Sequence, residues 1–266
     1  MPDATWKPRL IALDVDGTLL DPDTQTISAA VRTSVRRAVD AGAEVIVATG
    51  RSMLGALPVL ADLGLTRGVA LCSNGAVVLD AATGEAVSVE TFEPAPVVAE
   101  LARRVPGSIL AVERLGEGNL VTAPFGPDEL HGPQHVGTIE DVTAGPVPRL
   151  VANWVGHEPA EVVAAMRGAV LPGATFTLDH YEPWVTVVPQ DVTKGAALEK
   201  LRAELGVPAA ETFAAGDGDN DVQMLEWAAH GVAMGQGPAV VHAAADEVTA
   251  PVAEDGLATA LDRWFR

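Results

Sequence analysis

The stretch Leu10-Ile11-Ala12-Leu13-Asp14-Val15-Asp16-Gly17-Thr18 carries the strongest signal in the sequence. Its first four residues form a short apolar run that is typical of a buried strand. Asp14 and Asp16 follow this run directly. At the carboxyl end of a parallel strand, their side chains would project into the crevice where α/β sheets bind ligands. Gly17 permits a tight turn, after which Thr18 can reach back toward the same crevice.

Three more polar clusters stand at predicted strand ends or helix starts. Thr49-Gly50-Arg51 follows the apolar run 45–48, and Gly216-Asp217-Gly218-Asp219-Asn220-Asp221 follows the run 212–215. Lys194 lies just ahead of a helical pattern and is one of only three lysines in the chain. A carboxylate that attacks a phosphate monoester needs charge neutralisation, phosphate-holding donors and a divalent cation. The four clusters together contain the residue types for that chemistry.

Strand-like runs alternate with helical patterns in the first part of the chain. Residues 10–13, 45–48 and 69–71 are predicted strands, and Ser28 can cap a helix that ends near Gly42. This alternation predicts an α/β fold with a parallel sheet covered by helices.

The same alternation returns after Lys194. The predicted elements there are a helix to about residue 205, a strand over 212–215, a helix over 219–228, a strand over 231–234 and a helix over 256–264. Between the two parts lies an insertion with predicted strands at 109–112, 150–155, 175–178 and 184–188 and a helix at 159–166. We therefore predict a core domain in two parts, residues 1–78 and 190–266, split by an α+β cap domain at 79–189.

Composition excludes several classes of protein. A formal net charge of -19 opposes binding to nucleic acid or to an anionic membrane. No apolar stretch approaches the roughly 20 residues that span a bilayer. Residues 1–8 lack the basic flank and apolar stretch of a secretory signal, and the single cysteine, Cys72, cannot form an internal disulfide. We expect a cytoplasmic protein in which Cys72 is a small buried strand residue.

The motifs resemble a known family of hydrolases. Four of them match the ordered signatures of the haloacid dehalogenase (HAD) superfamily: Asp14-x-Asp16-Gly17-Thr18, Thr49-Gly50-Arg51, Lys194 and Gly216-Asp217-x-x-Asn220-Asp221. Ser73-Asn74-Gly75 and residues 187–195 are similar to the Cof-type phosphatase branch, and the resemblance runs from about Arg9 to the C-terminus. It implies a Rossmann-like parallel-sheet core with helices on both faces and an inserted α+β cap domain.

The resemblance also implies a phospho-aspartate mechanism that depends on Mg²⁺. It assigns Asp14 as the nucleophile and as a metal ligand. Asp16 would bind the metal through its backbone carbonyl, protonate the leaving group and then activate water. Asp217 would complete the metal site, because hard oxygen ligands suit Mg²⁺. Asp221 would either ligate the metal or support the metal and the lysine from behind.

Thr49 and Lys194 would assist catalysis by holding the transferring phosphoryl group, and Lys194 would also orient Asp14. The full set of substrate-binding residues implied by the resemblance is Thr49, Gly50, Arg51, Asn74, Lys194 and Asn220.

Some polar residues have an ordinary structural explanation as well. Arg51 could form a surface ion pair, and Asn74 could satisfy a turn. Asp219 is predicted to cap the following helix. His131 and His135 are four residues apart, but the intervening Gly-Pro argues against a helical metal pair, so we expect loop histidines. His180, Tyr181, Glu182 and Trp184 could form a specificity surface or part of the cap core.

The leading functional hypothesis is a magnesium-dependent phosphatase acting on a small phosphorylated metabolite, with a sugar phosphate as the first candidate. Two alternatives stay open. A sugar phosphomutase would return the phosphoryl group to the sugar instead of passing it to water. A non-catalytic protein would bind a phosphate ligand for regulation. The sequence leaves the oligomeric state open.

Overall fold

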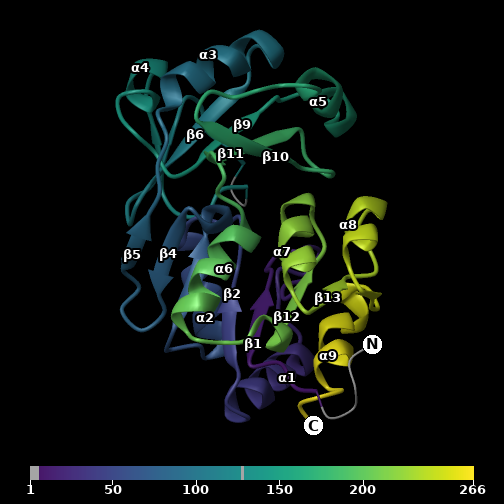
Figure 1. Ribbon diagram of the computed structural model, residues 1–266. Helices are drawn as coiled ribbons and strands as arrows, with labels where there is room; N and C mark the ends of the chain where they lie inside the picture. The colour runs from purple at the N-terminus through teal and green to yellow at the C-terminus, as the bar shows by residue number, and fades with distance from the viewer. Residues whose placement is uncertain (1–5, 127–128) are drawn as a thin grey trace.

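The computed structural model describes residues 6–126 and 129–266. A core domain contains both ends of the chain, and a smaller cap domain lies over one edge of it (Figure 1). The first five residues of the predicted core segment 1–78 lie outside the described residues, as does most of the stretch 1–8 that was inspected for a secretory signal.

The core is built on a five-stranded sheet in the order β14-β13-β12-β1-β2, and every neighbouring pair in it is parallel. Its strands are β1 (Leu10–Leu13), β2 (Glu44–Val47), β12 (Thr212–Gly216), β13 (His230–Ala233) and β14 (Glu247–Val248). The register pairs Leu13 with Val47 on one side and with Ala215 on the other. The segments that follow β1, β2 and β12 therefore leave the sheet at the same edge.

Three further strands continue this sheet beyond β2. They are β3 (Val69–Cys72), β4 (Val77–Asp80) and β5 (Ala86–Val89), which pair as an antiparallel meander. β3 joins the core through a parallel bridge between Ala48 and Leu71, and the Thr49 N–H donates to the Leu71 carbonyl at 2.8 Å. The predicted boundary between residues 78 and 79 thus falls inside β4. We propose that the chain enters the cap after Glu90, whose N–H still donates to the Ala76 carbonyl, and returns near Pro189.

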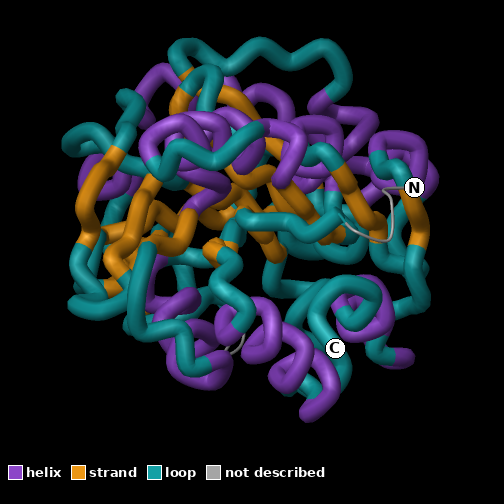
Figure 2. Tube along the Cα trace, turned by 60° about the horizontal axis from the view of Figure 1, so that its bottom comes forward, coloured by secondary structure: helices purple, strands orange, loops and turns teal. Residues whose placement is uncertain are grey.

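Helices cover both faces of the core sheet, because its buried strands are apolar on both sides. The α-helices of the core are α1 (Ala29–Asp40), α2 (Met53–Leu63), α6 (Lys194–Glu204), α7 (Val222–Trp227), α8 (Ala239–Ala244) and α9 (Gly256–Leu261). Ile11 and Leu13 of β1 belong to the apolar cluster that contains α1, α2 and α9. Leu10 and Ala12, on the opposite face, belong to the cluster with α6, α7 and α8. Figure 2 shows the strands as a band with helices on either side.

The predicted elements differ from the observed ones mainly at their ends. Ser28 caps α1 by accepting the Val31 N–H, and Gly42 follows the helix with a φ of 88°, as expected. The predicted helix over 219–228 is divided, because a 3₁₀ turn precedes α7. The described 3₁₀ turns are η1 (Ser73–Gly75), η2 (Ala209–Glu211), η3 (Asp219–Asp221) and η4 (Val252–Glu254).

The cap is a six-stranded sheet with helices on its outer face. Its strands are β6 (Ile109–Arg114), β7 (Gly118–Val121), β8 (Gln134–Val136), β9 (Leu150–Asn153), β10 (Ala174–Leu178) and β11 (Trp184–Pro189), in the order β10-β11-β9-β6-β7-β8. Its helices are α3 (Pro94–Arg104), α4 (Ile139–Val142) and α5 (Pro159–Met166). These helices lie away from the core, so the other face of the cap sheet looks toward it (Figure 1). The predicted fold class, a parallel-sheet core with helices on both faces and an inserted α+β cap, is confirmed.

Candidate active site

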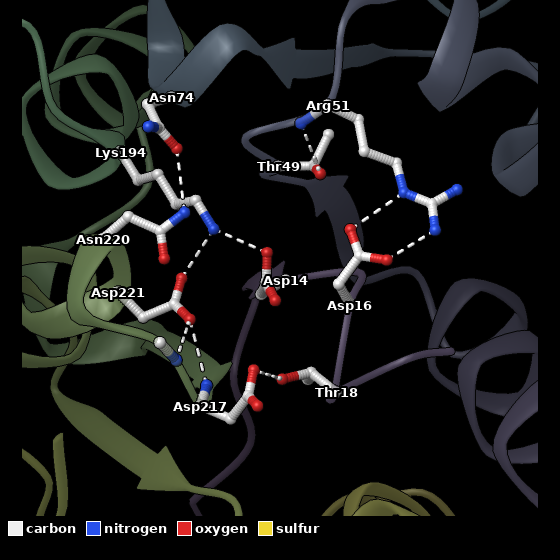
Figure 3. Close-up of polar contacts among 11 residues, drawn as sticks. Asp14, Asp16, Thr18, Thr49, Arg51, Asn74, Lys194, Asp217, Asn220 and Asp221 are labelled. Atoms are coloured by element: carbon white, nitrogen blue, oxygen red, sulfur yellow. Dashed lines mark hydrogen bonds and ion pairs between the residues drawn. The ribbon is translucent and has the colours of Figure 1, made fainter. Parts of the chain in front are cut away.

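Asp14 lies directly after β1, where a buried lysine holds its carboxylate. The Lys194 ammonium donates to Asp14 Oδ1 at 2.5 Å and to Asp221 Oδ1 at 2.6 Å (Figure 3). Lys194 is the first residue of α6, and its side chain is fully buried. Burial alone would lower its pKa, but the two carboxylates outweigh that effect and raise it. Lys194 is therefore a fixed positive charge beside Asp14.

Asp221 shapes the loop that follows β12. Its Oδ2 accepts the backbone N–H groups of Asp217 and Gly218, each at 2.9 Å. Gly216 is required there, because a Cβ at that position would lie 2.4 Å from Asp221 Cγ. Both carboxylate oxygens of Asp221 are thus engaged, one with Lys194 and the other with the loop.

Three buried acids form a cluster that could hold a metal ion. One ligand oxygen from each of Asp14, Asp217 and Asp221 lies within 4.8 Å of the other two. Burial, followed by the charge of Asp221, raises the pKa of Asp14 well above its ordinary value and that of Asp217 to about 7. One lysine thus faces three carboxylates, which leaves an excess of buried negative charge. The donor set, all oxygen, fits a hard divalent cation.

Gly17 lets the chain after Asp14 approach Asp217 closely. Gly17 has a φ of 79°, and a Cβ there would lie 2.1 Å from Asp217 Oδ2. Thr18 Oγ1 donates to Asp217 Oδ1 at 3.5 Å, as its predicted turn back into the crevice requires. Gln236, just after β13, donates to the Gly17 carbonyl at 2.5 Å and to Asp217 Oδ2 at 3.1 Å. Gln236 was not singled out in the sequence, although it follows a predicted strand end.

Asp16 points away from the acid cluster and pairs with Arg51. The Arg51 guanidinium donates to both oxygens of Asp16, at 2.8 Å from Nε and 2.5 Å from Nη2. The Asp16 side chain is about half exposed, at 51%, whereas that of Arg51 is buried. Thr49 lies beside this pair, and its Oγ1 accepts the Arg51 N–H at 3.1 Å. The ion-pair alternative for Arg51 is thus observed, with a predicted site residue as the partner.

Asn74 and Asn220 bring two distant loops together. Asn220 Nδ2 donates to Asn74 Oδ1 at 2.9 Å, and Asn74 adopts a left-handed backbone with a φ of 56°. Gly50 lies against them, since a Cβ there would be 3.2 Å from Asn74 Oδ1. All the site residues predicted from the sequence therefore surround one region at the edge of the core sheet.

A cavity of about 350 Å³ opens between this region and the cap. Its core side includes Asp14, Asp16 and Asp217, and its cap side includes the aromatic residues Tyr181 and Trp184. The remaining cap residues that line it are Glu129, Leu130, His131, Arg149, Thr177, Leu178, Asp179, His180 and Thr186. Of the four residues predicted to form a specificity surface or part of the cap core, His180, Tyr181 and Trp184 line the cavity and Glu182 does not.

Two structural predictions for polar residues are wrong. Asp219 does not cap the following helix. Its Oδ1 lies 2.8 Å from His180 Nε2 across the gap between core and cap. The loop N–H groups are already taken by Asp221. His131 lies in a loop, as expected, but His135 belongs to β8 and pairs with Leu120. Cys72 is a buried strand residue, as predicted, and burial raises the pKa of its thiol.

Comparison with known proteins identifies the family. The family model for haloacid dehalogenase-like hydrolases matches residues 11–102 and 169–261. The chain belongs to the haloacid dehalogenase-like hydrolase family. The resemblance to its Cof-type branch is confirmed, and the match covers all four motifs. The stretch between the two matched segments is most of the cap.

Similar proteins cover most of the chain. A 5-amino-6-(5-phospho-D-ribitylamino)uracil phosphatase of Bacillus subtilis, YitU, is 32% identical and covers 97% of this chain and 98% of its own length. An HMP-PP phosphatase of Serratia proteamaculans is 28% identical and covers 85% of this chain and 84% of its own. Among solved structures, a HAD subclass IIB sugar phosphatase matches with a TM-score of 0.82 at 25% identity, over 96% of this chain and 98% of that one.

Within residues 6–126 and 129–266, no helix is long and apolar enough to cross a membrane.

Proposed function

We propose that the protein is a magnesium-dependent phosphatase that hydrolyses a small phosphorylated metabolite through a phospho-Asp14 intermediate. One observation carries the proposal. A buried lysine holds Asp14 at the floor of a cavity, and two more buried carboxylates lie within 4.8 Å of one another and of Asp14. As a member of this hydrolase family, the chain is a phosphoric monoester hydrolase.

Asp14 is the proposed nucleophile because Lys194 fixes one of its oxygens while the residue lines the cavity. Attack on phosphorus transfers the phosphoryl group to the carboxylate and releases an alcohol. Lys194 would also neutralise charge on the phosphoryl oxygens, and Thr49, Gly50 and Asn220 would hold them. These groups are preorganised by bonds already present in the fold, so little reorganisation is needed at the moment of reaction.

The residues proposed to hold Mg²⁺ are Asp14 and Asp217, with the backbone carbonyl of Asp16. Asp221 is the better candidate for a residue that supports the metal site without contacting the metal, because one of its oxygens already accepts from Lys194 and the other from the Asp217 N–H. When bound, Mg²⁺ would neutralise the charge that builds up on the carboxylates and the phosphoryl oxygens. The raised pKa values of Asp14 and Asp217 support this placement, since they arise first from burial and then from the charge of Asp221, and a bound cation would offset both effects.

Asp16 is proposed to protonate the leaving alcohol and then to take a proton from the attacking water. Arg51 donates to both of its oxygens. We infer that substrate binding draws Arg51 away from at least one of these oxygens, toward the phosphoryl group or the leaving group. Both residues line the cavity, so such a movement would bring Arg51 to the substrate.

The proposed substrate is a sugar phosphate or a similarly small phosphorylated polyol. Thr177, Thr186 and Tyr181, which carry hydroxyl groups, and Glu129 and Asp179, which carry carboxylates, line the cap side of the cavity. Such a wall offers acceptors and hydroxyl groups to a leaving group that carries several O–H or N–H donors. The names of the relatives, a sugar phosphatase, a 5-amino-6-(5-phospho-D-ribitylamino)uracil phosphatase and an HMP-PP phosphatase, support a small metabolite.

A screen of phosphorylated metabolites with Mg²⁺, scored by release of inorganic phosphate, tests the function. The Asp14→Asn variant should remain folded and release no phosphate, because the amide cannot make the same attack. Near-wild-type turnover in the pure, folded variant would refute the phospho-Asp14 intermediate. Incubation with hexose 1-phosphates separates the alternatives: a phosphomutase would yield an isomeric hexose phosphate. A non-catalytic binder would bind esters tightly and turn none of them over.

A further inference from the structure

Three polar side chains of the cap form one row on the face that looks toward the core. Asn119 of β7 is the cross-strand partner of Glu113 in β6, and the Glu113 N–H donates to the carbonyl of Arg149 beside β9. Cross-strand neighbours project from the same face of a sheet. Arg149 Nε lies 3.7 Å from Glu113 Oε2, and its Nη2 donates to Asn119 Oδ1 at 3.5 Å. All three residues are more than 90% buried.

This row reaches across to the loops that carry the proposed phosphoryl-binding residues. Arg149 Nη1 donates to the Gly50 carbonyl at 3.0 Å. Glu113 Oε1 accepts the Met53 N–H, the first of helix α2, at 2.9 Å, and Glu113 Oε2 accepts the Ser73 hydroxyl. Two cap residues therefore hold three groups of the core. None of these contacts is implied by the four sequence motifs.

The held loops are themselves bound to each other at the site. The Ser73 N–H donates to the Arg51 carbonyl at 2.8 Å, and the Asn74 N–H donates to the Thr49 carbonyl at 3.0 Å. A shift of Gly50 or Ser73 would therefore move Thr49, Arg51 and Asn74 together. The contacts that Arg149 and Glu113 make therefore constrain the geometry of the phosphoryl-binding loop.

A buried ion pair is a costly way to join two domains by stability alone. Desolvation of the two charges commonly cancels their attraction, so an apolar contact of the same size would stabilise the junction equally well. Arg149 also leaves its Nε without a hydrogen-bond partner among the described residues. Directional bonds to one carbonyl and two donors do what an apolar contact cannot, because they fix the position of backbone groups.

We propose that Arg149 and Glu113 are positioning residues of the enzyme, which hold the loop 49–53 in its catalytic geometry from the cap. This inference rests on the proposed phosphatase function, and it makes the cap part of the phosphoryl-binding machinery as well as a cover for the leaving group. Because Gly50 is bound through its carbonyl, the effect acts on the phosphoryl-binding loop that every substrate would use. Removal of Arg149 should therefore impair all phosphate esters to a similar degree.

Two variants test the proposal in the full-length protein. Arg149→Lys keeps the positive charge beside Glu113. The lysine side chain is shorter and ends in a single ammonium group, so it cannot also donate to the Gly50 carbonyl and to Asn119 Oδ1. The double variant Arg149→Met/Glu113→Gln removes both charges together, which avoids an unpaired buried charge. The matched control is Arg104→Lys, since Arg104 pairs with Glu100 and donates to the Ala165 and Arg167 carbonyls, all within the cap.

We expect kcat with p-nitrophenyl phosphate and with a hexose phosphate to fall by about 10- to 100-fold in both Arg149 variants, with much smaller changes in KM. Backbone hydrogen exchange over residues 49–53 should rise in the Arg149 variants and stay unchanged in the control. A loss confined to the hexose phosphate would overturn the proposal and make Arg149 a leaving-group contact. Unchanged exchange in a folded variant would also overturn it. If wild-type protein hydrolyses no ester, the proposed function fails, while the exchange experiment still decides the positioning role.

Discussion

Replacement of Asp217 by asparagine should make the metal-free protein more stable and the metal-bound protein less so. Asp217 is a buried acid whose pKa is raised to about 7 from an ordinary 3.8, first by burial and then by Asp221. A raised pKa means that the folded state binds the proton more tightly than the unfolded chain. This group therefore stabilises the fold below about pH 4, and that contribution is lost as the pH rises through about 7. Asparagine is neutral throughout this range.

The pKa difference sets an upper limit on the effect. A shift of about three units at 1.36 kcal/mol each corresponds to ~4 kcal/mol once the acid is ionised. Asp14 is part of the same cluster of buried negative charge, so the substitution of Asp217 alone removes only part of the repulsion. We therefore expect the free energy of unfolding to rise by about 1 to 3 kcal/mol above pH 8. For a protein of this size, each kcal/mol raises Tm by roughly 2 to 4 °C.

Thermal unfolding in EDTA, from pH 4 to pH 9, measures this directly. The difference in Tm between Asp217→Asn and wild type should be near zero at pH 4 and reach a plateau above pH 8. Added Mg²⁺ should raise Tm of the wild type much more than that of the variant. Asp219→Asn is the matched control, because Asp219 lies in the same loop but outside the acid cluster. A variant that is less stable in EDTA at pH 8, and that responds to Mg²⁺ like wild type, would refute the reasoning.

Three further predictions concern the chemistry, the turn and the cap. Asp16→Asn should block turnover of alkyl phosphates, whereas p-nitrophenyl phosphate, whose leaving group needs no proton, should give a burst of about one nitrophenolate per enzyme before water attack stalls. Normal turnover of alkyl phosphates would contradict the proton-donor role, and steady turnover of p-nitrophenyl phosphate without a burst would contradict the water-activating role. Gly17→Ala should lose Mg²⁺-induced stabilisation, because its Cβ would lie 2.1 Å from Asp217 Oδ2; an unchanged magnesium titration would show that the turn can adapt. Tyr181→Ala and Thr186→Val should alter the ranking of phosphate esters by kcat/KM more strongly than they alter the Mg²⁺ concentration that activity requires. A lower affinity for Mg²⁺ with an unchanged ranking would show that the cap does not select the leaving group.

The sequence by itself determined the fold class and the main residues around the cavity. Both follow from local features. Apolar runs of four residues predict buried strands, and the polar residues that end them must meet at one sheet edge if the strands are parallel. Asp14, Thr49 and Asp217 could be placed together for this reason, although they are far apart in the chain. The helix that begins at Lys194 was likewise predictable from its pattern.

Only the tertiary structure decided which residues face one another between the domains. Glu113 and Arg149 stand beside apolar strand residues in the sequence, where nothing marks them as different from surface charges. Glu113 and Arg149 become neighbours on one face of the cap sheet because β6 pairs with β7 and because the Glu113 N–H donates to the Arg149 carbonyl, just before β9. Their contacts with the core depend on how the cap lies over the loop at Gly50. The bidentate pair of Asp16 and Arg51 and the placement of β4 and β5 in the core sheet were undetermined for the same reason. Strand register and domain packing are long-range properties, which local patterns of apolar and polar residues do not encode.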